Sequence, residues 1–239
     1  MKRLFTFLCL IALTCPLLGQ ENLRQAEDLY RQGKFAAALK SYEEILKNHP
    51  KDPFVYYNIG NCYFKMGSKG LAAANYYRAY RLAPRDEDIR HNLALSLAAG
   101  QAELVPAGVP AVLYHLFFYF SYTELTGLMY ALWWLIGGLI LFAVLRRRWN
   151  RFLTGAVVVL CVVSGWWYAR RSIEQEPLAV IASPLAEVRS GPGKNFPASA
   201  SAAQGHLLSI QDEKDAWYQV ILKSQGIKGW IEKQTVEKI

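Results

Sequence analysis

Two long apolar runs separated by a cluster of arginines constrain this chain more than any other feature of its sequence. Residues 125–145 contain no charged side chain, and as a helix they would extend about 31 Å, close to the ~30 Å hydrocarbon core of a bilayer. Residues 152–169 form a second uncharged run, and four arginines lie in residues 146–151 between them. We therefore expect a transmembrane hairpin with a short basic loop.

The net charge of +8 is concentrated near these runs and at the N-terminus. Eight basic residues lie in three segments that contain no acid: Lys2, Arg3, Arg146, Arg147, Arg148, Arg151, Arg170 and Arg171. The other 19 basic residues are balanced by 19 acids, so the rest of the chain is close to neutral. Nucleic-acid binding requires a basic face, so this pattern indicates membrane topology and argues against a nucleic-acid partner.

The positive-inside rule predicts that the arginine loop is cytoplasmic. No Lys or Arg occurs in residues 101–145, so the opposite end of the hairpin is expected outside. Arg170 and Arg171 oppose this orientation, but they are two charges against four. The Trp-Trp-Tyr sequence at residues 166–168 lies where an outer aromatic belt is expected.

Trp133 and Trp134 fall in the middle of the first run rather than at an interface. We expect them to pack against neighbouring helices, either the second run of the hairpin or the helices of a partner protein.

The N-terminus is typical of a secretory signal peptide over residues 1–19, with Lys2 and Arg3 before an apolar run. Leu17 occupies a position where a small residue usually precedes cleavage, so an uncleaved anchor stays open. Lipidation at Cys15 also stays open, although Thr14 is a poor lipobox residue. In every case the following domain is exported.

Residues 20–99 repeat with a period of 34. Four pairs show the period: Gly33 and Gly67, Ala38 and Ala72, Tyr42 and Tyr76, Pro50 and Pro84. Small residues allow helices to approach closely, glycines turn the chain and prolines end helices. The pattern resembles the tetratricopeptide repeat family, with two full repeats and a further helix over residues 87–99. Lys69 departs from it, because repeat one has Phe35 there.

In that family the first helix of each pair lines a concave groove that binds extended or helical peptides. Mapping this face selects eight candidate peptide-binding residues: Phe54, Tyr57, Asn58, Asn61, Phe64, Lys65, His91 and Asn92. The asparagines are suited to hydrogen-bond a peptide backbone or a terminal carboxylate. The alternative is that these eight residues bind no peptide, so that the polar ones are ordinary exposed positions and the aromatic ones pack in the core. So few repeats bury little core, so we expect the array to lean on a partner or on the membrane.

Residues 100–124 link the array to the hairpin. Gly and Pro residues punctuate residues 100–110, and residues 111–123 are aromatic and uncharged. Thirteen residues are too few to span a bilayer, so we expect an interfacial or re-entrant helix packed against the hairpin. A third span is the alternative, and it would put the two soluble domains on opposite sides.

Residues 176–239 change to short alternating runs with turns. We expect strands at residues 178–182, 185–189, 206–211, 217–222 and 228–232. Three motifs resemble bacterial SH3 domains: VRSGPG at 188–193, WYQV at 217–220 and GIKGWI at 226–231. The resemblance implies a five- or six-stranded barrel. It also implies a groove for peptidoglycan stems or proteins, with Arg189, Trp217 and Trp230 as candidates; alternatively, both tryptophans belong to the core.

No catalytic or metal-binding pattern is visible. The four histidines lie in different segments, and no zinc-protease, nucleophile-elbow or phosphate-loop motif occurs. Of the four cysteines, Cys9 and Cys15 lie in the signal segment and Cys161 in the second apolar run, which leaves Cys62 without a partner. We expect no enzyme activity, cofactor, metal site or disulfide framework.

The expected fold class is a multidomain membrane protein: an all-α tetratricopeptide domain, a two-helix transmembrane hairpin and a C-terminal all-β SH3-like barrel. This order of domains resembles BatE-type proteins of the Bacteroides aerotolerance family. The resemblance implies an inner-membrane scaffold with both soluble domains in the periplasm and von Willebrand A-domain partners, acting in envelope stress or oxygen tolerance. A peptidoglycan-binding tether or sensor, and a chaperone for secreted chains, are the alternatives.

Overall fold

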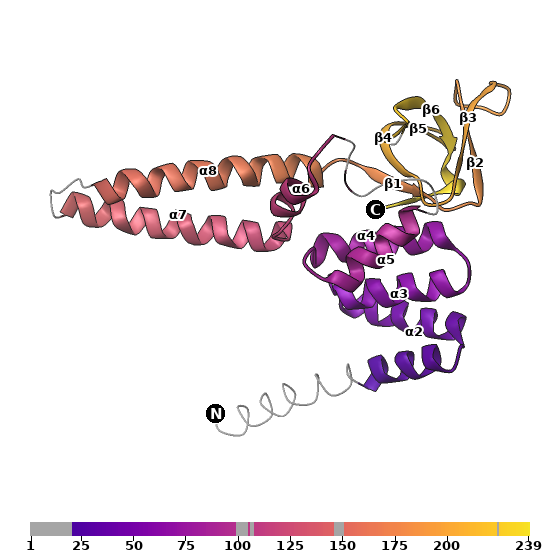
Figure 1. The fold of residues 1–239 in the computed structure, drawn as a ribbon, viewed down its shortest axis with the longest axis horizontal. Helices are drawn as coiled ribbons and strands as arrows, with labels where there is room; N and C mark the ends of the chain where they lie inside the picture. The colour runs from indigo at the N-terminus through magenta and orange to yellow at the C-terminus, as the bar shows by residue number, and fades with distance from the viewer. Residues whose placement is uncertain (1–20, 99–104, 106–107, 146–150, 224) are drawn as a thin grey trace, which may run out of the picture.

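The computed structural model describes residues 21–98, 105, 108–145, 151–223 and 225–239. Three parts are visible in Figure 1: a stack of helices, a long helical hairpin that projects from it, and a curled sheet that contains the C-terminus. The expected signal peptide and the arginines at positions 146–148 lie outside the described residues.

The helical stack contains two pairs of antiparallel helices and one further helix. Its members are a helix over residues 21–31, α2 (Phe35–Asn48), α3 (Pro53–Lys65), α4 (Lys69–Leu82) and α5 (Glu87–Ala98). Gly33 and Gly67 turn the chain within each pair with φ of +75° and +81°, which confirms the predicted turns.

The 34-residue period extends to the helix starts. The Asp52 carboxylate accepts a hydrogen bond from the Phe54 N–H at 2.9 Å, and 34 residues later Asp86 accepts one from the Ile89 N–H at 3.0 Å. Each acid therefore satisfies an N–H that the first turn of a helix leaves unpaired.

Small residues give the close helix contacts that the sequence predicts. Ala26, Ala38 and Ala72 are fully buried. A Cβ at Gly60 would lie 2.6 Å from the Tyr76 ring, so α3 and α4 approach too closely for any side chain there.

The hairpin consists of α7 (Tyr122–Leu145) and α8 (Arg151–Glu174), preceded by the short α6 (Ala111–Phe117). By length and composition, α7 and the segment Leu153–Glu174 are each long and apolar enough to cross a membrane. α7 starts three residues before the first predicted run, which began at residue 125, and α8 ends five residues after the second predicted run, which ended at residue 169. The start of α7 is a capping box, in which the Ser121 N–H donates to Glu124 at 2.9 Å and the Glu124 N–H donates to the Ser121 hydroxyl at 3.2 Å.

The expected packing of residues 111–123 on the hairpin is confirmed, since Trp166 Nε1 of α8 donates to the Phe117 carbonyl at 3.1 Å. The alternative of a third span is wrong. α6 has only seven residues, about 10 Å of helix, and the chain leaves the helix at Phe118 before α7 begins.

The C-terminal part is an antiparallel sheet of seven strands in the order β3-β2-β6-β5-β4-β1-β7. The strands are β1 (Leu178–Ile181), β2 (Leu185–Arg189), β3 (Ala198–Ala203), β4 (Leu207–Lys214), β5 (Trp217–Leu222), β6 (Ile227–Glu232) and β7 (Val236–Lys238). The prediction of five or six strands is wrong because it missed β3 and β7. β3 reads ASASAA, without the β-branched or aromatic residues typical of strands, and β7 has only three residues.

Strand β1 is the strand of the sheet that packs against α4, and all four of its residues are buried. Ala179 and Ile181 pack in the core of the sheet, whereas Val180 packs with the alanines of α4 and with α5. This alternation follows from the two-residue period of a strand. The array thus leans on the sheet of its own chain.

Gly70 makes this contact possible. It is buried near the start of α4, and a Cβ there would lie 2.1 Å from the Ile181 carbonyl oxygen. Lys69, where the second repeat departs from the first, is the residue next to Gly70. The departure from the repeat therefore falls at the start of α4, where α4 contacts β1.

Replacing Gly70 with alanine is expected to weaken the packing of the sheet on α4. The overlap is with backbone atoms of β1, which cannot rotate away. We expect a loss of about 1–3 kcal/mol in the free energy of unfolding, as in other overpacked contacts. Urea or thermal unfolding of the full chain in detergent measures it.

Gly137→Ala is the matched control, because Gly137 is also helical and a Cβ there meets no atom within 4 Å. Equal stability of the two variants would contradict the close approach of α4 and β1.

Candidate peptide groove, barrel cleft and α4 junction

The groove face, formed by the eight predicted peptide-binding residues, lies on α3 and α5. Its centre is a hydrogen-bond network. The Tyr76 hydroxyl of α4 donates to Asn61 Oδ1 at 2.7 Å, and Asn92 Nδ2 of α5 donates to the Tyr57 hydroxyl oxygen at 2.9 Å. Asn92 Nδ2 also lies 3.4 Å from Asn61 Oδ1. Burial raises the pKa of Tyr76 well above its ordinary value, so its hydroxyl keeps the proton that it donates.

The predicted asparagines therefore bond to one another and to tyrosines before any ligand arrives. Asn58 also takes part, since its Oδ1 lies 3.5 Å from Asn61 Nδ2. The network holds these side chains in place, which lowers the entropy cost of using their remaining donors for a peptide.

The rest of the groove face surrounds this polar centre. Lys65, His91 and Phe54 are exposed, the last by 59%, whereas Phe64 is half-buried against the core. The face therefore offers two basic side chains and an apolar edge around fixed amides. Its use as a binding site stays a prediction.

The sheet carries a second candidate site, a cleft of about 280 Å³. Its charged lining is two cations and two acids, Arg189, Lys194, Glu187 and Glu232. Arg189 is held in position, because Nη1 donates to the Phe196 carbonyl at 2.7 Å and to the Lys194 carbonyl at 3.0 Å.

The predicted groove residues of the barrel divide between cleft and core. Arg189 and Trp217 line the cleft, but Trp217 is only 8% exposed and belongs mainly to the interior. Trp230 is half-buried and pairs with Arg189 across β2 and β6, outside the set of residues that line the cleft.

The α4 junction, defined by Arg78, Arg81 and Arg85 with their partners, connects the array to the other parts. Arg78 and Arg81 lie three residues apart and therefore on one side of α4, and Arg85 follows in the turn after the helix ends at Leu82. Arg78 Nη2 donates to Glu237 of β7 at 2.6 Å, Arg81 Nε to Glu174 of α8 at 2.6 Å, and Arg85 pairs with Glu124 of α7 at 2.5 Å. Each arginine thus contacts a different element.

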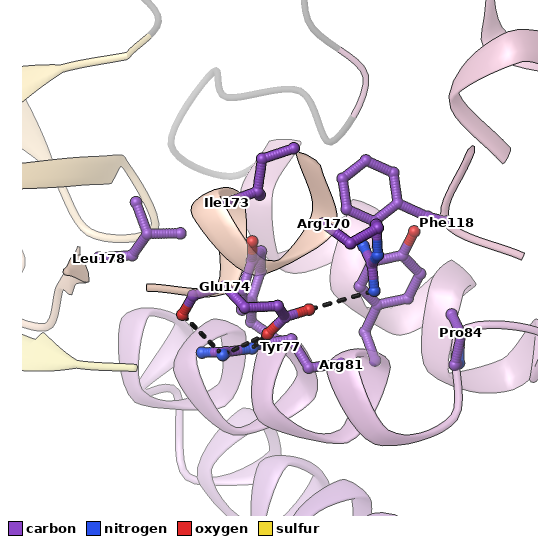
Figure 2. Close-up of a pocket in the computed structure, with 9 residues that line it drawn as sticks. Tyr77, Arg81, Pro84, Phe118, Arg170, Ile173, Glu174 and Leu178 are labelled. Atoms are coloured by element: carbon purple, nitrogen blue, oxygen red, sulfur yellow. Dashed lines mark hydrogen bonds and ion pairs between the residues drawn. The ribbon is translucent and has the colours of Figure 1, made fainter. Parts of the chain in front are cut away.

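Glu174 binds a second arginine at this junction (Figure 2). Arg170 Nη2 lies 3.1 Å from Glu174, and its guanidinium carbon lies 4.4 Å from the centre of the Phe118 ring. Arg170 is only 2% exposed, and its Nε and Nη1 have no hydrogen-bond partner among the described residues. Arg170 is a buried part of the contact between α8, α4 and α6.

Tyrosines complete the surroundings of the pair. Burial raises the pKa of Tyr77 to about 12, although Arg81 acts in the opposite direction, and burial also raises the pKa of Tyr80 and Tyr114. These phenols therefore stay neutral near physiological pH, which leaves Glu174 as the carboxylate between the two arginines.

Sequence reasoning missed the junction. The Arg81–Glu174 bond joins residues 93 positions apart, and no local sequence pattern predicts that these two residues pair. Three signals were visible, of which the first two are the arginines at positions 78, 81 and 85 of repeat two and the Arg170–Glu174 pair one helical turn apart. The capping box at Ser121 and Glu124 was a third, and it marks the true start of α7.

Trp133 and Trp134 of α7 are 57% and 83% exposed, so contact with α8 accounts for at most the smaller part of either ring. Their predicted contact with the helices of a partner protein stays a prediction.

Within the described residues, no group of three or more His, Cys, Asp or Glu side chains is arranged to hold a metal. Cys62 is buried and Cys161 is exposed, both as free thiols, and burial raises the pKa of Cys62 to about 11. Cys9 and Cys15 lie outside the described residues.

Two family models match parts of the chain. The one described as tetratricopeptide repeat matches residues 23–87, and the one described as bacterial SH3 domain matches residues 185–237. The chain therefore contains both kinds of domain, as the two resemblances predicted.

Curated relatives match short stretches of the chain. The chain is 36% identical over 53 residues to Hsp70-Hsp90 organizing protein 2 of Arabidopsis thaliana and 30% identical over 66 residues to Tetratricopeptide repeat protein 16 of Homo sapiens. These matches cover 22% and 28% of this chain but only 9% and 8% of the relatives. The chain thus spans less than a tenth of the length of these relatives.

A solved structure also shows similarity, the type III secretion chaperone SycD of Yersinia enterocolitica in complex with a peptide of the translocator YopD. The sequence identity is 15%, and the match covers 65% of this chain and 94% of that one. The TM-score of 0.33 is too low to establish a shared fold.

Replacing Glu174 with glutamine is expected to destabilise the α4 junction. The variant keeps the side chain's shape but leaves Arg81 and Arg170 without a counter-charge, and losing one partner of a buried pair costs about 3–5 kcal/mol. Because Arg81 is 32% exposed, we expect the lower end, about 3 kcal/mol. Chemical unfolding of the full chain in detergent measures it.

Glu87→Gln is the control, since Glu87 is 90% exposed and its pair with Arg90 is long at 3.7 Å. A Glu174→Gln variant as stable as this control would mean that the ion pairs do not hold the parts together.

Proposed function

We propose that this protein is a non-enzymatic scaffold of a bacterial inner membrane whose repeats bind segments of partner proteins. The observation that carries the proposal is the attachment of the groove to the hairpin. Tyr76 of α4 donates a hydrogen bond to Asn61 of the groove face. The next residue, Tyr77, lines a pocket together with Arg170 and Glu174 of α8. A ligand in the groove is thereby tied to the hairpin.

The membrane location is supported by α7 and α8, which are long and apolar enough to span. The arginines between them favour a cytoplasmic loop under the positive-inside rule. Both soluble domains would then lie in the periplasm, on the side to which the signal sequence exports the first of them.

Protein partners are the ligands that best suit the repeats. The groove face resembles the peptide-binding surface of its family, and one group of relatives is named as Hsp70-Hsp90 organizing proteins. Two basic residues beside fixed amides suit a peptide that offers carbonyl or carboxylate oxygens.

The identity of the partners rests on the resemblance to BatE-type proteins. It implies membrane partners with von Willebrand A domains and a role in envelope stress or aerotolerance. In this arrangement Trp133 and Trp134 would contact the helices of those partners, because both side chains are largely exposed.

Photo-crosslinking in cells tests the scaffold. A benzophenone amino acid in place of Phe54 or Trp134, both exposed aromatic residues, is expected to capture partner proteins at the groove and in the membrane, respectively. Mass spectrometry of the adducts identifies them.

The same amino acid at Lys40, an exposed position on α2, is the control. Adducts that are equally abundant at all three positions, or absent from the Phe54 variant, would contradict groove binding.

The alternative function is a cell-wall tether, and the cleft of the sheet favours it. Its paired cations and acids suit a ligand with both carboxylate and amine groups, such as a peptidoglycan stem peptide. Bacterial SH3 domains imply the same ligand class.

Purified sacculi test the tether. The full chain in detergent is expected to sediment with sacculi if this function holds, and Lys194→Glu should reduce the bound fraction several-fold, because the substitution leaves the cleft with an excess of acids. Lys228→Glu, also exposed but outside the cleft lining, is the control. No retention of the native chain would remove the tether and leave the scaffold.

A further inference from the structure

The segment around α6 has two different faces, and its inner face is occupied. Tyr114 and Phe118 pack ring to ring at 4.5 Å, and Phe118 lies under the buried Arg170 guanidinium. The Phe117 carbonyl accepts the bond from Trp166. These contacts attach α6 firmly to α8 and to the α4 junction.

The outer face is apolar and uncovered. We define the α6 face as Val109, Val112, Leu113, Leu116 and Tyr119, all of which are exposed. Val112 is the most exposed, at 77%. The spacing of three and four residues places Val112, Leu113 and Leu116 along one side of α6, and Val109 and Tyr119 lie just before and just after the helix. Residues 104–123 contain no Lys, Arg, Asp or Glu. Such a face in contact with water is unfavourable.

The position of the α6 face along the hairpin is set by Trp166. This residue lies one helical turn before Arg170, so the bond to Phe117 places α6 where α8 changes from uncharged residues to the charged junction. The opposite helix changes at the same end, since Glu124 and its partner Arg85 lie at the start of α7. Figure 1 shows α6 at the base of the hairpin, beside both helices.

Aromatic residues mark the same level. Tyr119 is exposed with Arg85 5.3 Å from its ring centre, and Tyr168 of α8 is exposed by 69%. Amphipathic rings beside basic groups are typical of the boundary between lipid headgroups and acyl chains. The hairpin itself exposes apolar side chains along α7 from Leu128 near this base to Leu145.

We propose that the α6 face is a lipid-contact surface, seated at the headgroup–acyl boundary of the bilayer that the hairpin crosses. This inference rests on the proposed function, because it requires the hairpin to be in a bilayer. The occupant is lipid rather than a second protein, since residues 104–123 carry no Lys, Arg, Asp or Glu and the face lies at the base of two helices that are long and apolar enough to cross a membrane.

Contact of the α6 face with lipid, here called the lipid seat, would also fix the position of the groove relative to the membrane. α6 is fixed to the α4 junction through Phe118 and Arg170, and α4 belongs to the array. A seated α6 therefore holds the repeats at a fixed height directly above the membrane. The partners that the groove meets would be membrane-anchored chains with segments near the surface.

Depth-dependent quenching tests the seat in the full chain, reconstituted in nanodiscs of phosphatidylcholine and phosphatidylglycerol. Native cysteines are replaced by alanine, and a fluorophore is placed by Leu113→Cys on the α6 face, Val159→Cys in the middle of α8, or Lys40→Cys on α2. The quenchers are lipids with a nitroxide near the top or near the end of the acyl chain.

We expect the label at position 113 to be quenched at least twofold more by the shallow nitroxide than by the deep one. The label at 159 should show the reverse order, and the label at 40 should respond to neither. This combination supports the seat.

The failures are distinguishable. Quenching at 159 without quenching at 113 overturns the lipid seat and leaves the proposed membrane function standing. Absence of quenching at both positions overturns both proposals. Protection at 113 together with crosslinking of two Leu113→Cys chains by a short bis-maleimide would show a second copy on the α6 face, which also overturns the seat.

Discussion

The ion pairs of Glu174 with Arg81 and Arg170 hold the parts of this protein in one arrangement. Arg81 belongs to the helical array, whereas Arg170 and Glu174 form the end of the hairpin. Arg170 is almost fully buried, and an unpaired charge in such a place is costly. Separation of the array from the hairpin would take Arg81 away from Glu174 and expose the buried Arg170–Glu174 pair. Phe118 adds to this, because it covers the guanidinium from the side of α6.

Apolar packing on the other side of α4 completes the arrangement. Val180, Leu207 and Ile239 of the sheet pack with the alanines and tyrosines of α4 and with α5. Only residues 175–177 separate α8 from β1, so the chain enters the sheet directly from the junction. Two and a half repeats are a short array by the standards of repeat proteins. Here the sheet and the hairpin base cover the surface that a further repeat would cover.

Among the residues that the structure describes, this arrangement leaves Phe54, Lys65 and His91 of the groove face exposed. α4 contacts the other parts with Arg78, Arg81 and Gly70, whereas the groove is formed by α3 and α5. The two surfaces are linked through neighbouring residues of α4: Tyr76 bonds to Asn61, and Tyr77 lines the junction. A rigid link of this kind suits a scaffold, since what the groove binds is positioned relative to the hairpin.

The sequence by itself determined the class of every part, because the signals are local. The 34-residue period specifies paired helices, the uncharged runs specify helices of membrane length, and the motifs ending in Val220 and Ile231 specify the sheet. The period also predicted that Tyr57, Asn61 and Asn92 share a face, but not that they bond to one another. Only the tertiary structure decided the junction: its acids and arginines lie up to 159 residues apart, so their pairing depends on how α4, α8 and β7 pack. The tertiary structure also decided that β3, with the sequence ASASAA, is a strand. Its pairing with β2 outweighs the low strand propensity of alanine and serine.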